Sequence, residues 1–145
     1  YFLDFKEDSK ADLKLKNLEK KFKQIIISGK NSSLESIEYE LKEYFKGNLK
    51  EFKTEVAFLG TPFQVTVWKA LQTIPYGKTI SYADLAMLIG KPSAFRAAAN
   101  ANGKNLLPII IPCHRVINSN GQLGGYSSGL KRKQWLLAHE FHMCP

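Results

Sequence analysis

Residues 61–103 carry three helix start signals in close succession, and these signals constrain the fold more than any other feature of the chain. The stretch TPFQ places Thr61 as an N-cap, with Pro at the first helical position and Gln closing a capping box. Ser81 begins a second helix, which Gly90 ends. Pro92 and the serine after it begin a third helix at once. Two short helices joined by about three residues are typical of a helix-turn-helix.

The third predicted helix has an unusual composition. Residues 97–102 read AAANAN, and Arg96 precedes them. Small side chains let a helix approach another surface closely. That surface is either an external partner, toward which Arg96 projects, or the interior of the same domain, and both interpretations are open at this point.

Positive charge is concentrated in the second part of the chain. Residues 1–60 carry 12 Lys against 11 Asp and Glu, a balance of +1, whereas residues 61–145 carry 9 Lys and Arg against 2 acidic residues, a balance of +7. Such a surplus suits a polyanion such as nucleic acid, although a basic surface without a partner has the same composition. No apolar run approaches the ~20 residues of a membrane helix, so we expect no membrane partner.

The first part of the chain is rich in Lys and Glu and carries no motif of its own. The segments YFLDF and KQIIIS, residues 1–5 and 23–28, favour short strands. Residues 32–45 have an amphipathic helical pattern, with Ser32 and Glu35 as a capping box.

The chain length of 145 residues fits one domain, or a compact domain with a small companion. Composition changes near residue 55, so we expect a small domain over residues 1–55 and a second domain over residues 56–145. Two cysteines are too few for a disulfide framework, which favours a reducing, cytoplasmic compartment. No secretory pattern is found at the start, and an opening Tyr without Met suggests a trimmed chain.

The apolar segment LLPIIIPC, residues 106–113, predicts a buried strand that ends at Pro112. Asn120 followed by Gly121 predicts a hairpin turn. Residues 129–140 predict a last helix. The inward face of that helix is expected to contain Leu130, Trp135, Leu136 and Leu137.

Cys113, His114 and Arg115 are consecutive and suggest a reactive thiol. A free thiol has a pKa near ~8.5, so a reactive cysteine needs a base or positive neighbours, which His114 and Arg115 supply. Glu140 opposes the macrodipole at the end of the last helix and could orient the imidazole. The alternative is a small core cysteine. We expect no zinc site, because no set of three or four ligands has a workable spacing.

The combination of motifs is more specific than its parts. IPCHRV resembles the active-site signature of the O6-alkylguanine-DNA alkyltransferases, also called methylated-DNA–protein-cysteine methyltransferases. Further segments resemble successive blocks of this family, in order, over about residues 41–140. These segments are EYFKGNLKEF, GTPFQVTVWKALQTIPYGKTISYADLA, GKPSAFRAAANANGKN, PIIIPCHRVINSNGQLGGYSSGL and KQWLLAHE.

The resemblance implies an α/β (α+β) fold, with a small N-terminal α/β domain of the ribonuclease-H-like type and a C-terminal domain of the winged helix-turn-helix type. It implies a DNA repair protein that binds double-stranded DNA by the minor groove and flips the damaged nucleotide. Its own cysteine takes the alkyl group from O6-methylguanine, with O4-methylthymine as a further candidate lesion, in a single turnover. We expect a monomer that needs no cofactor and no metal.

The resemblance also assigns catalytic roles. It makes Cys113 the alkyl acceptor and His114 the base, acting through a water. Glu140 is implied to hold the imidazole, and Asn105 to fix the turn before the active-site strand. Tyr82 is implied to help turn the nucleotide and to donate to the leaving guanine.

Two further sets of residues follow from the resemblance. Arg96 is implied to fill the vacated base stack, and Ser127 to donate toward the guanine oxygen. The implied DNA-binding residues are Tyr82, Arg96, Ala97, Asn100, Asn102 and Arg115. The implied pocket residues are Val116, Tyr126, Ser127 and Gly129. Family members usually have Val and Gly soon after the arginine, and Ala99 in place of Gly adds a methyl that could alter the fit to the groove.

Three other classes are open to test. An alkyltransferase-like damage sensor typically replaces the cysteine, so Cys113 argues against that class. A helix-turn-helix regulator would place polar base-reading side chains on the second helix, where only Arg96 and asparagines are available. A Cys-His hydrolase is disfavoured, because adjacent residues are poor geometry for a conventional dyad.

Overall fold

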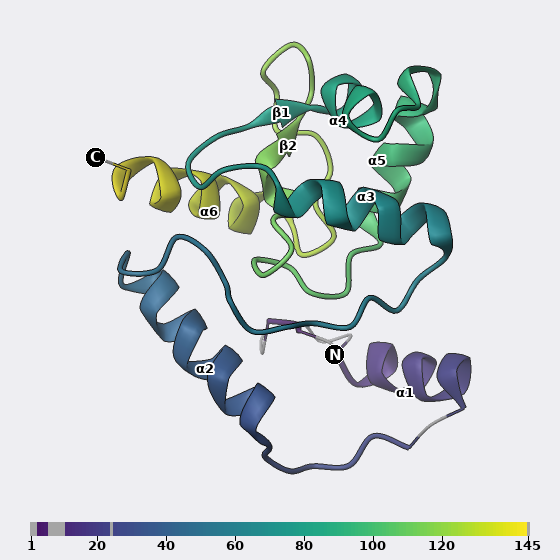
Figure 1. The fold of residues 1–145 in the computed structure, drawn as a ribbon, viewed down its shortest axis with the longest axis vertical. Helices are drawn as coiled ribbons and strands as arrows, with labels where there is room; N and C mark the ends of the chain where they lie inside the picture. Colours follow the sequence, from purple (N-terminus) through teal and green to yellow (C-terminus); the bar gives the residue numbers. More distant parts are fainter. Residues whose placement is uncertain (1–2, 6–10, 24, 145) are drawn as a thin grey trace.

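The computed structural model describes residues 3–5, 11–23 and 25–144. In Figure 1, α1 and α2 lie on one side of the molecule, and the helices from α3 onward gather on the other. In chain order the elements are α1 (Ala11–Phe22), α2 (Ser32–Phe45), α3 (Pro62–Gln72), β1 (Ile80–Ser81), α4 (Tyr82–Leu88), the 3-10 turn η1 (Pro92–Ala94), α5 (Phe95–Gly103), the 3-10 turn η2 (Cys113–Arg115), β2 (Val116–Ile117) and α6 (Leu130–His142).

The helix start signals after residue 60 are confirmed. Thr61 caps α3 through a complete capping box with Gln64, and Ser81 caps α4 through one with Asp84. Gly90 has φ +70°, a conformation that glycine adopts without strain, and it ends α4 where the chain turns. α5 packs against α4 as the second helix of a helix-turn-helix.

The prediction for the first part of the chain is confirmed only for α2. The helix has the predicted bounds, but its cap is Asn31, whose Oδ1 accepts from the Leu34 amide at 2.9 Å, so the Ser32–Glu35 capping box is wrong. Residues 3–5 and 25–28 form no strand, which contradicts the prediction there, and positions 1, 2 and 24 lie outside the described residues. The ribonuclease-H-like description of this domain is therefore not confirmed.

The predicted strand over residues 106–113 is wrong, although the segment is buried almost throughout. The chain turns back on itself, with Ile109 at φ +76° and the Ile111 amide donating to the Leu107 carbonyl at 2.9 Å. The side chain of Asn105 makes hydrogen bonds that a neighbouring strand would otherwise make. Its Nδ2 donates to the Ile111 carbonyl at 2.8 Å, and its Oδ1 accepts from the Leu107 amide at 2.9 Å. A side-chain amide thus satisfies backbone groups that a sheet would otherwise pair.

The two-stranded sheet of the described chain is parallel. β1 pairs with β2, with Ile80 opposite Val116. The predicted turn at Asn120-Gly121 forms, because the Gly121 amide donates to the Asn118 carbonyl at 2.9 Å. The Asn118 amide also donates to the Gln122 carbonyl across this turn at 2.8 Å, and no strand follows β2 within residues 118–129.

Helix α6 buries a different face from the one predicted. Leu136 is buried and Leu137 is partly buried, but Leu130 and Trp135 are 52% and 53% exposed. Lys133 and Glu140 share the buried face with Leu136, at the three- and four-residue spacing of one helix face. The face that meets the rest of the protein is therefore partly charged. None of the helices in the described segments is long and apolar enough to cross a membrane.

Two adjoining hydrophobic clusters position the site. The larger one joins α3, α4 and α5 around Trp68, Leu71 and Leu85. The smaller one joins α2 to α6 and contains Tyr44, Tyr76, Ile109 and Leu136. The segment carrying η2 runs between them, so that its polar residues lie deep inside the molecule.

Candidate active site

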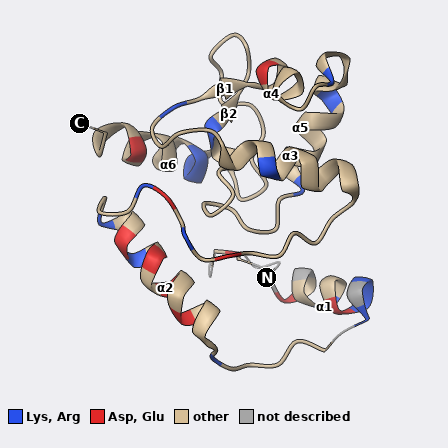
Figure 2. Cartoon of the chain, viewed as in Figure 1, with Lys and Arg blue, Asp and Glu red and all other residues tan. Residues whose placement is uncertain are grey.

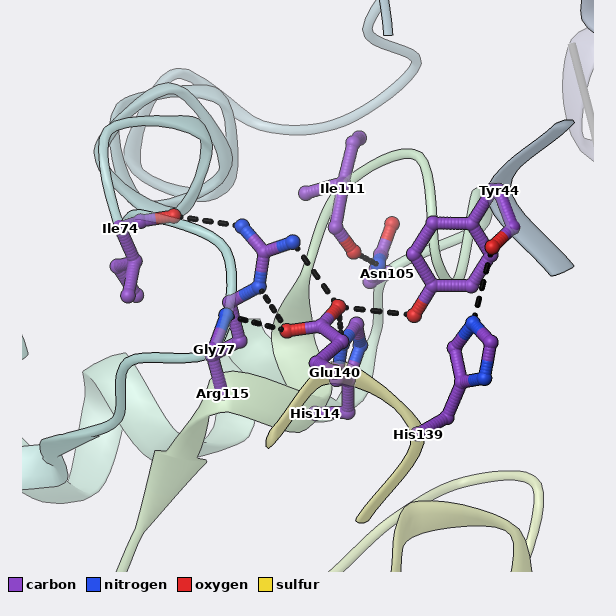
Figure 3. Close-up of polar contacts among 9 residues, drawn as sticks. All are labelled: Tyr44, Ile74, Gly77, Asn105, Ile111, His114, Arg115, His139 and Glu140. Carbon is purple, nitrogen blue, oxygen red and sulfur yellow. Dashed lines mark hydrogen bonds and ion pairs between the residues drawn. The ribbon is translucent and has the colours of Figure 1, made fainter. Parts of the chain in front are cut away.

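Glu140 is fully buried and lies at the centre of a hydrogen-bonded cluster (Figure 3). Tyr44 Oη donates to Glu140 Oε1 at 2.8 Å, and the Gly77 amide donates to Oε2 at 3.1 Å. The Arg115 guanidinium donates to both oxygens, each at 2.9 Å. His114 Nε2 lies 2.8 Å from Oε1. The acidic residue at an unfavourable helix end is thus held by partners from three other parts of the chain.

The partners of Glu140 determine its charge. Burial by itself raises the pKa of a carboxyl group. The hydrogen bonds from His114 and Arg115, together with the positive charge of Arg115, more than offset burial and hold the pKa of Glu140 at about 2. The carboxylate is therefore ionised at neutral pH.

Arg115 does not have the predicted position of a DNA-binding residue. Its side chain is 6% exposed and its Nη1 donates to the Ile74 carbonyl at 2.6 Å. The other guanidinium nitrogens pair with Glu140, and the ring of Tyr76 lies 5.6 Å from the guanidinium carbon. The structure therefore buries Arg115 as the counter-charge of the Glu140 carboxylate, whereas the sequence predicted an exposed residue that contacts DNA.

His114 is a neutral imidazole with a defined tautomer. Burial lowers the pKa of His114, and Glu140 acts in the opposite direction. Because an ionised carboxylate only accepts hydrogen bonds, Nε2 must carry the proton that points at Glu140. Nδ1 is then unprotonated, and it has no hydrogen-bond partner among the residues the structure describes. The ring can therefore accept one proton at Nδ1.

Cys113 is 2% exposed, and the side chain of Asn105 makes a polar contact with its thiol. Asn105 Nδ2 lies 3.1 Å from Sγ. Burial raises the pKa of the Cys113 thiol to about 11, with Asn105 and Lys133 working against burial. The thiol is consequently protonated at neutral pH and needs a base before it can act as a nucleophile.

Lys133 is a site residue that the sequence reasoning missed. It is fully buried, and its Nζ donates to the carbonyls of Val116 at 2.6 Å, Gly125 at 3.3 Å and Leu123. Burial lowers the pKa of Lys133 to about 8, while the Cys113 charge acts to raise it. The spacing of three and seven residues to Leu136 and Glu140 was the available signal, because it places all three on one helix face.

A cavity of about 470 Å³ is lined in part by Asn102, whose side chain donates to the Cys113 carbonyl. Its lining brings together five of the predicted residues, Tyr82, Arg96, Asn102, Tyr126 and Ser127. Burial raises the pKa of both lining tyrosines, Tyr82 and Tyr126, which pack against the hydrophobic cluster that contains Cys113. Val116 and Gly129 do not line the cavity, and the Val116 carbonyl is held by Lys133.

Helix α5 has one buried face, which confirms that small side chains pack inside the domain, and one exposed face, for which an external partner stays a prediction. Ala98 and Ala101 are buried, and Trp68 Nε1 donates to the Ala101 carbonyl at 2.9 Å. Ala97 and Asn100 are exposed, as predicted for a contact surface, and Arg96 is exposed as well.

Asn102 is placed differently from the prediction. It is buried, and its Nδ2 donates to the Cys113 carbonyl at 3.3 Å, so it faces inward and holds the segment that carries the thiol. The exposed face of α5 and the cavity nevertheless adjoin, because Arg96 lines the cavity from that helix. In Figure 2, α1 and α2 carry red and blue positions together, while most charged positions from α3 onward are blue.

Comparison with known proteins places this arrangement in a family. Residues 62–142 match the family model of the 6-O-methylguanine DNA methyltransferase DNA-binding domain. The chain belongs to this family. It is 50% identical over 105 residues to the methylated-DNA–protein-cysteine methyltransferase of Shigella flexneri, with 72% of this chain and 61% of that protein covered. The chain thus spans about three fifths of the length of the curated relatives it matches.

Solved structures of the family have the same fold. The Mycobacterium tuberculosis OGT in complex with DNA superposes with a TM-score of 0.75 at 49% identity, covering 77% of this chain and 70% of that chain. The S. pombe Atl1 in complex with damaged DNA containing O6-carboxymethylguanine has a TM-score of 0.50 at 33% identity, covering 57% of this chain and 79% of that chain. The mixed helical fold with its small sheet is therefore that of the OGT structures.

Proposed function

We propose that this protein repairs DNA by moving the alkyl group of O6-alkylguanine onto the sulfur of Cys113, once per molecule. The observation that carries the proposal is a buried, protonated thiol in contact with Asn105 and next in sequence to a His114–Glu140 pair. Asn102, which bonds the Cys113 carbonyl, lines a cavity. The curated relatives and the DNA-bound M. tuberculosis structure support it.

The bond changes follow from the site. The Cys113 proton passes to His114 Nδ1 through a water, and Glu140 stabilises the imidazolium that forms. The Sγ electron pair then attacks the alkyl carbon in line, and the bond from that carbon to guanine O6 breaks. Guanine leaves with the bonding electrons, and we expect the Tyr82 hydroxyl to donate a hydrogen bond to it. Because the product is a thioether, the protein is consumed.

DNA binding is proposed for the exposed face of α5, through Arg96, Ala97 and Asn100. The small side chains suit a minor groove, whose degenerate pattern lets a repair protein act at any sequence. The base must leave the stack to reach the cavity, at a cost of a few kcal/mol that is smallest for a poorly paired base. The balance of +7 over residues 61–145 predicts salt-dependent binding.

The proposal also includes several more detailed statements about the domains, the lesion, the pocket and the oligomeric state. These are the winged helix-turn-helix type of the second domain, the division at residue 55, O6-methylguanine as the lesion, Ser127 and Tyr126 as pocket residues, and the monomeric state. The presence of Cys113 supports transfer over a damage sensor that only binds. A sequence-reading regulator is less well supported, because α5 exposes alanines where base-reading side chains would be needed.

Peptide mass measurement tests the proposal. After incubation with duplex DNA containing O6-methylguanine, we expect one added methyl group on the peptide with Cys113. Cys144 is an exposed free thiol in the same molecule and serves as an internal control that stays unmodified. Cys113→Ala should retain DNA binding and lose transfer. An unmodified Cys113 in folded, DNA-bound protein, or methylation of both cysteines, would overturn the proposal.

A further inference from the structure

Tyr44 holds α6 at two successive residues, although it belongs to α2. Its hydroxyl donates to Glu140 Oε1 at 2.8 Å, and its carbonyl accepts from His139 Nε2 at 2.9 Å. The contacts span 96 and 95 residues of sequence. Tyr44 is fully buried, so these bonds are not exchanged for bonds to solvent (Figure 3).

The hydroxyl of Tyr44 and the imidazole of His114 compete for the same carboxylate oxygen. Both lie 2.8 Å from Glu140 Oε1. A hydrogen bond to an ionised acceptor is about twice as strong as one between neutral groups, and it stabilises the charge of that acceptor. The negative charge that the carboxylate presents to His114 is therefore smaller when the phenol is in place.

We infer that Tyr44 is a positioning residue for the proposed transfer, and that its hydroxyl sets how strongly Glu140 attracts a proton to His114. The inference rests on the proposed function, because it concerns the base that accepts the Cys113 proton. It makes helix α2, which lies outside the matched residues 62–142, a part of the machinery.

Other charged and titratable groups facing the imidazole are retained when only the Tyr44 hydroxyl is removed. Besides Glu140, α6 contributes Lys133, whose charge lowers the pKa of His114. η2 contributes Arg115, which acts in the same direction, and Cys113 precedes His114. The loop after α3 contributes Tyr76 near Glu140. Loss of the phenol hydrogen bond thus leaves Glu140 as a stronger partner for a protonated His114.

The test compares Tyr44→Phe with Tyr76→Phe. Both changes delete one buried tyrosine hydroxyl from the same cluster, where the two rings lie 5.9 Å apart. The Tyr76 hydroxyl has no hydrogen-bond partner among the described residues, so its removal is the matched control. The pKa of His114 is measured by NMR in the protein without DNA, using carbon-labelled histidine and a His114→Gln variant for assignment.

We expect Tyr44→Phe to raise the pKa of His114 relative to wild type and Tyr76→Phe to leave it unchanged. In single-turnover transfer assays, the acid limb of the rate profile should move to higher pH. The rate of Tyr44→Phe should then fall about three- to tenfold at acidic pH and remain near that of wild type at pH ~8, since one unit of pKa is a factor of ten.

Two outcomes overturn the inference while leaving transfer itself intact. One is an unchanged His114 pKa in folded Tyr44→Phe, and the other is an equal loss of rate at every pH, which indicates a structural role alone. Failure of the wild-type protein to methylate Cys113 overturns the proposed function instead. The NMR titration still decides the inference about Tyr44 and Glu140 in that case, because it needs no activity.

Discussion

Replacing Glu140 with Gln tests the balance of buried charge at the centre of the site. The carboxylate accepts five hydrogen bonds from residues in the described chain. Gln keeps the size of the side chain but is neutral, and it turns one acceptor oxygen into an NH₂ donor. Arg115 then keeps a buried positive charge without a counter-charge. Some of the N–H groups that bonded the carboxylate then face the NH₂ group of the glutamine, which is itself a donor.

Two estimates of the cost agree. Removing one partner of a buried ion pair costs about 3–5 kcal/mol. Independently, burial would raise the pKa of Glu140, yet His114 and Arg115 lower it from 4.5 to about 2. That difference corresponds to a contribution of about 3 kcal/mol to the free energy of unfolding. Because the pKa is lower in the folded state, the contribution is present above pH ~4.5 and is lost as the pH falls toward ~2.

The measurement is urea denaturation at pH 7 and at intervals from pH 4.5 downward, followed by tryptophan fluorescence. We expect Glu140→Gln to lower the free energy of unfolding at pH 7 by about 3 kcal/mol. The variant should also lack the part of the fall in stability below pH ~4.5 that protonation of Glu140 causes in wild type. Glu38→Gln removes an exposed ion pair with Lys42 and should leave the free energy of unfolding nearly unchanged, because solvent screens that pair.

A second arm adds Arg115→Met to Glu140→Gln. The double variant should regain part of the lost stability, because the unpaired buried guanidinium is removed as well. The reasoning is refuted if Glu140→Gln costs less than about 1 kcal/mol at pH 7. It is also refuted if the variant retains the full acid sensitivity of wild type, or if the double variant is the less stable of the two.

Two further substitutions test the residues that surround the site, Lys133 and Gly124. Burial lowers the pKa of Lys133 to about 8, so the folded protein loses this proton at lower pH than the unfolded chain does. The free energy of unfolding of the wild-type protein should therefore rise between pH ~8 and ~10. Lys133→Met should abolish that part of the rise, measured by denaturation at a series of pH values. Gly124 has φ +67°, and a Cβ there would lie 3.0 Å from Asn118 Oδ1 and 3.0 Å from a Tyr82 ring carbon. Gly124→Ala should therefore lower the free energy of unfolding by more than about 1 kcal/mol, measured by thermal unfolding, and by more than Gly121→Ala, where φ is +82° but no atom lies within 4 Å. Equal losses in the two glycine variants would show that crowding at Gly124 contributes nothing.

The sequence by itself determined the features whose causes lie within a few residues of each other. Thr61 and Ser81 cap helices because each reaches an amide three residues ahead, and such pairs are visible in any sequence. The positive φ of Gly90 follows equally from a local stop signal. The adjacent Cys113 and His114, with the segments around them, likewise identified the family and directed attention to Glu140.

Only the tertiary structure decided which polar groups are buried and with what partners. Arg115 was predicted to bind DNA, yet it pairs with a carboxylate 25 residues away, and Tyr44 reaches the same carboxylate across 96 residues. Lys133 was not predicted at all, since a lysine is buried only where backbone carbonyls converge on it. The predicted strand at residues 106–113 became a turn because Asn105 satisfies its backbone. Burying a charge or an unpaired amide is costly without a partner, and the partner comes from chain segments whose meeting depends on the packing of the whole fold.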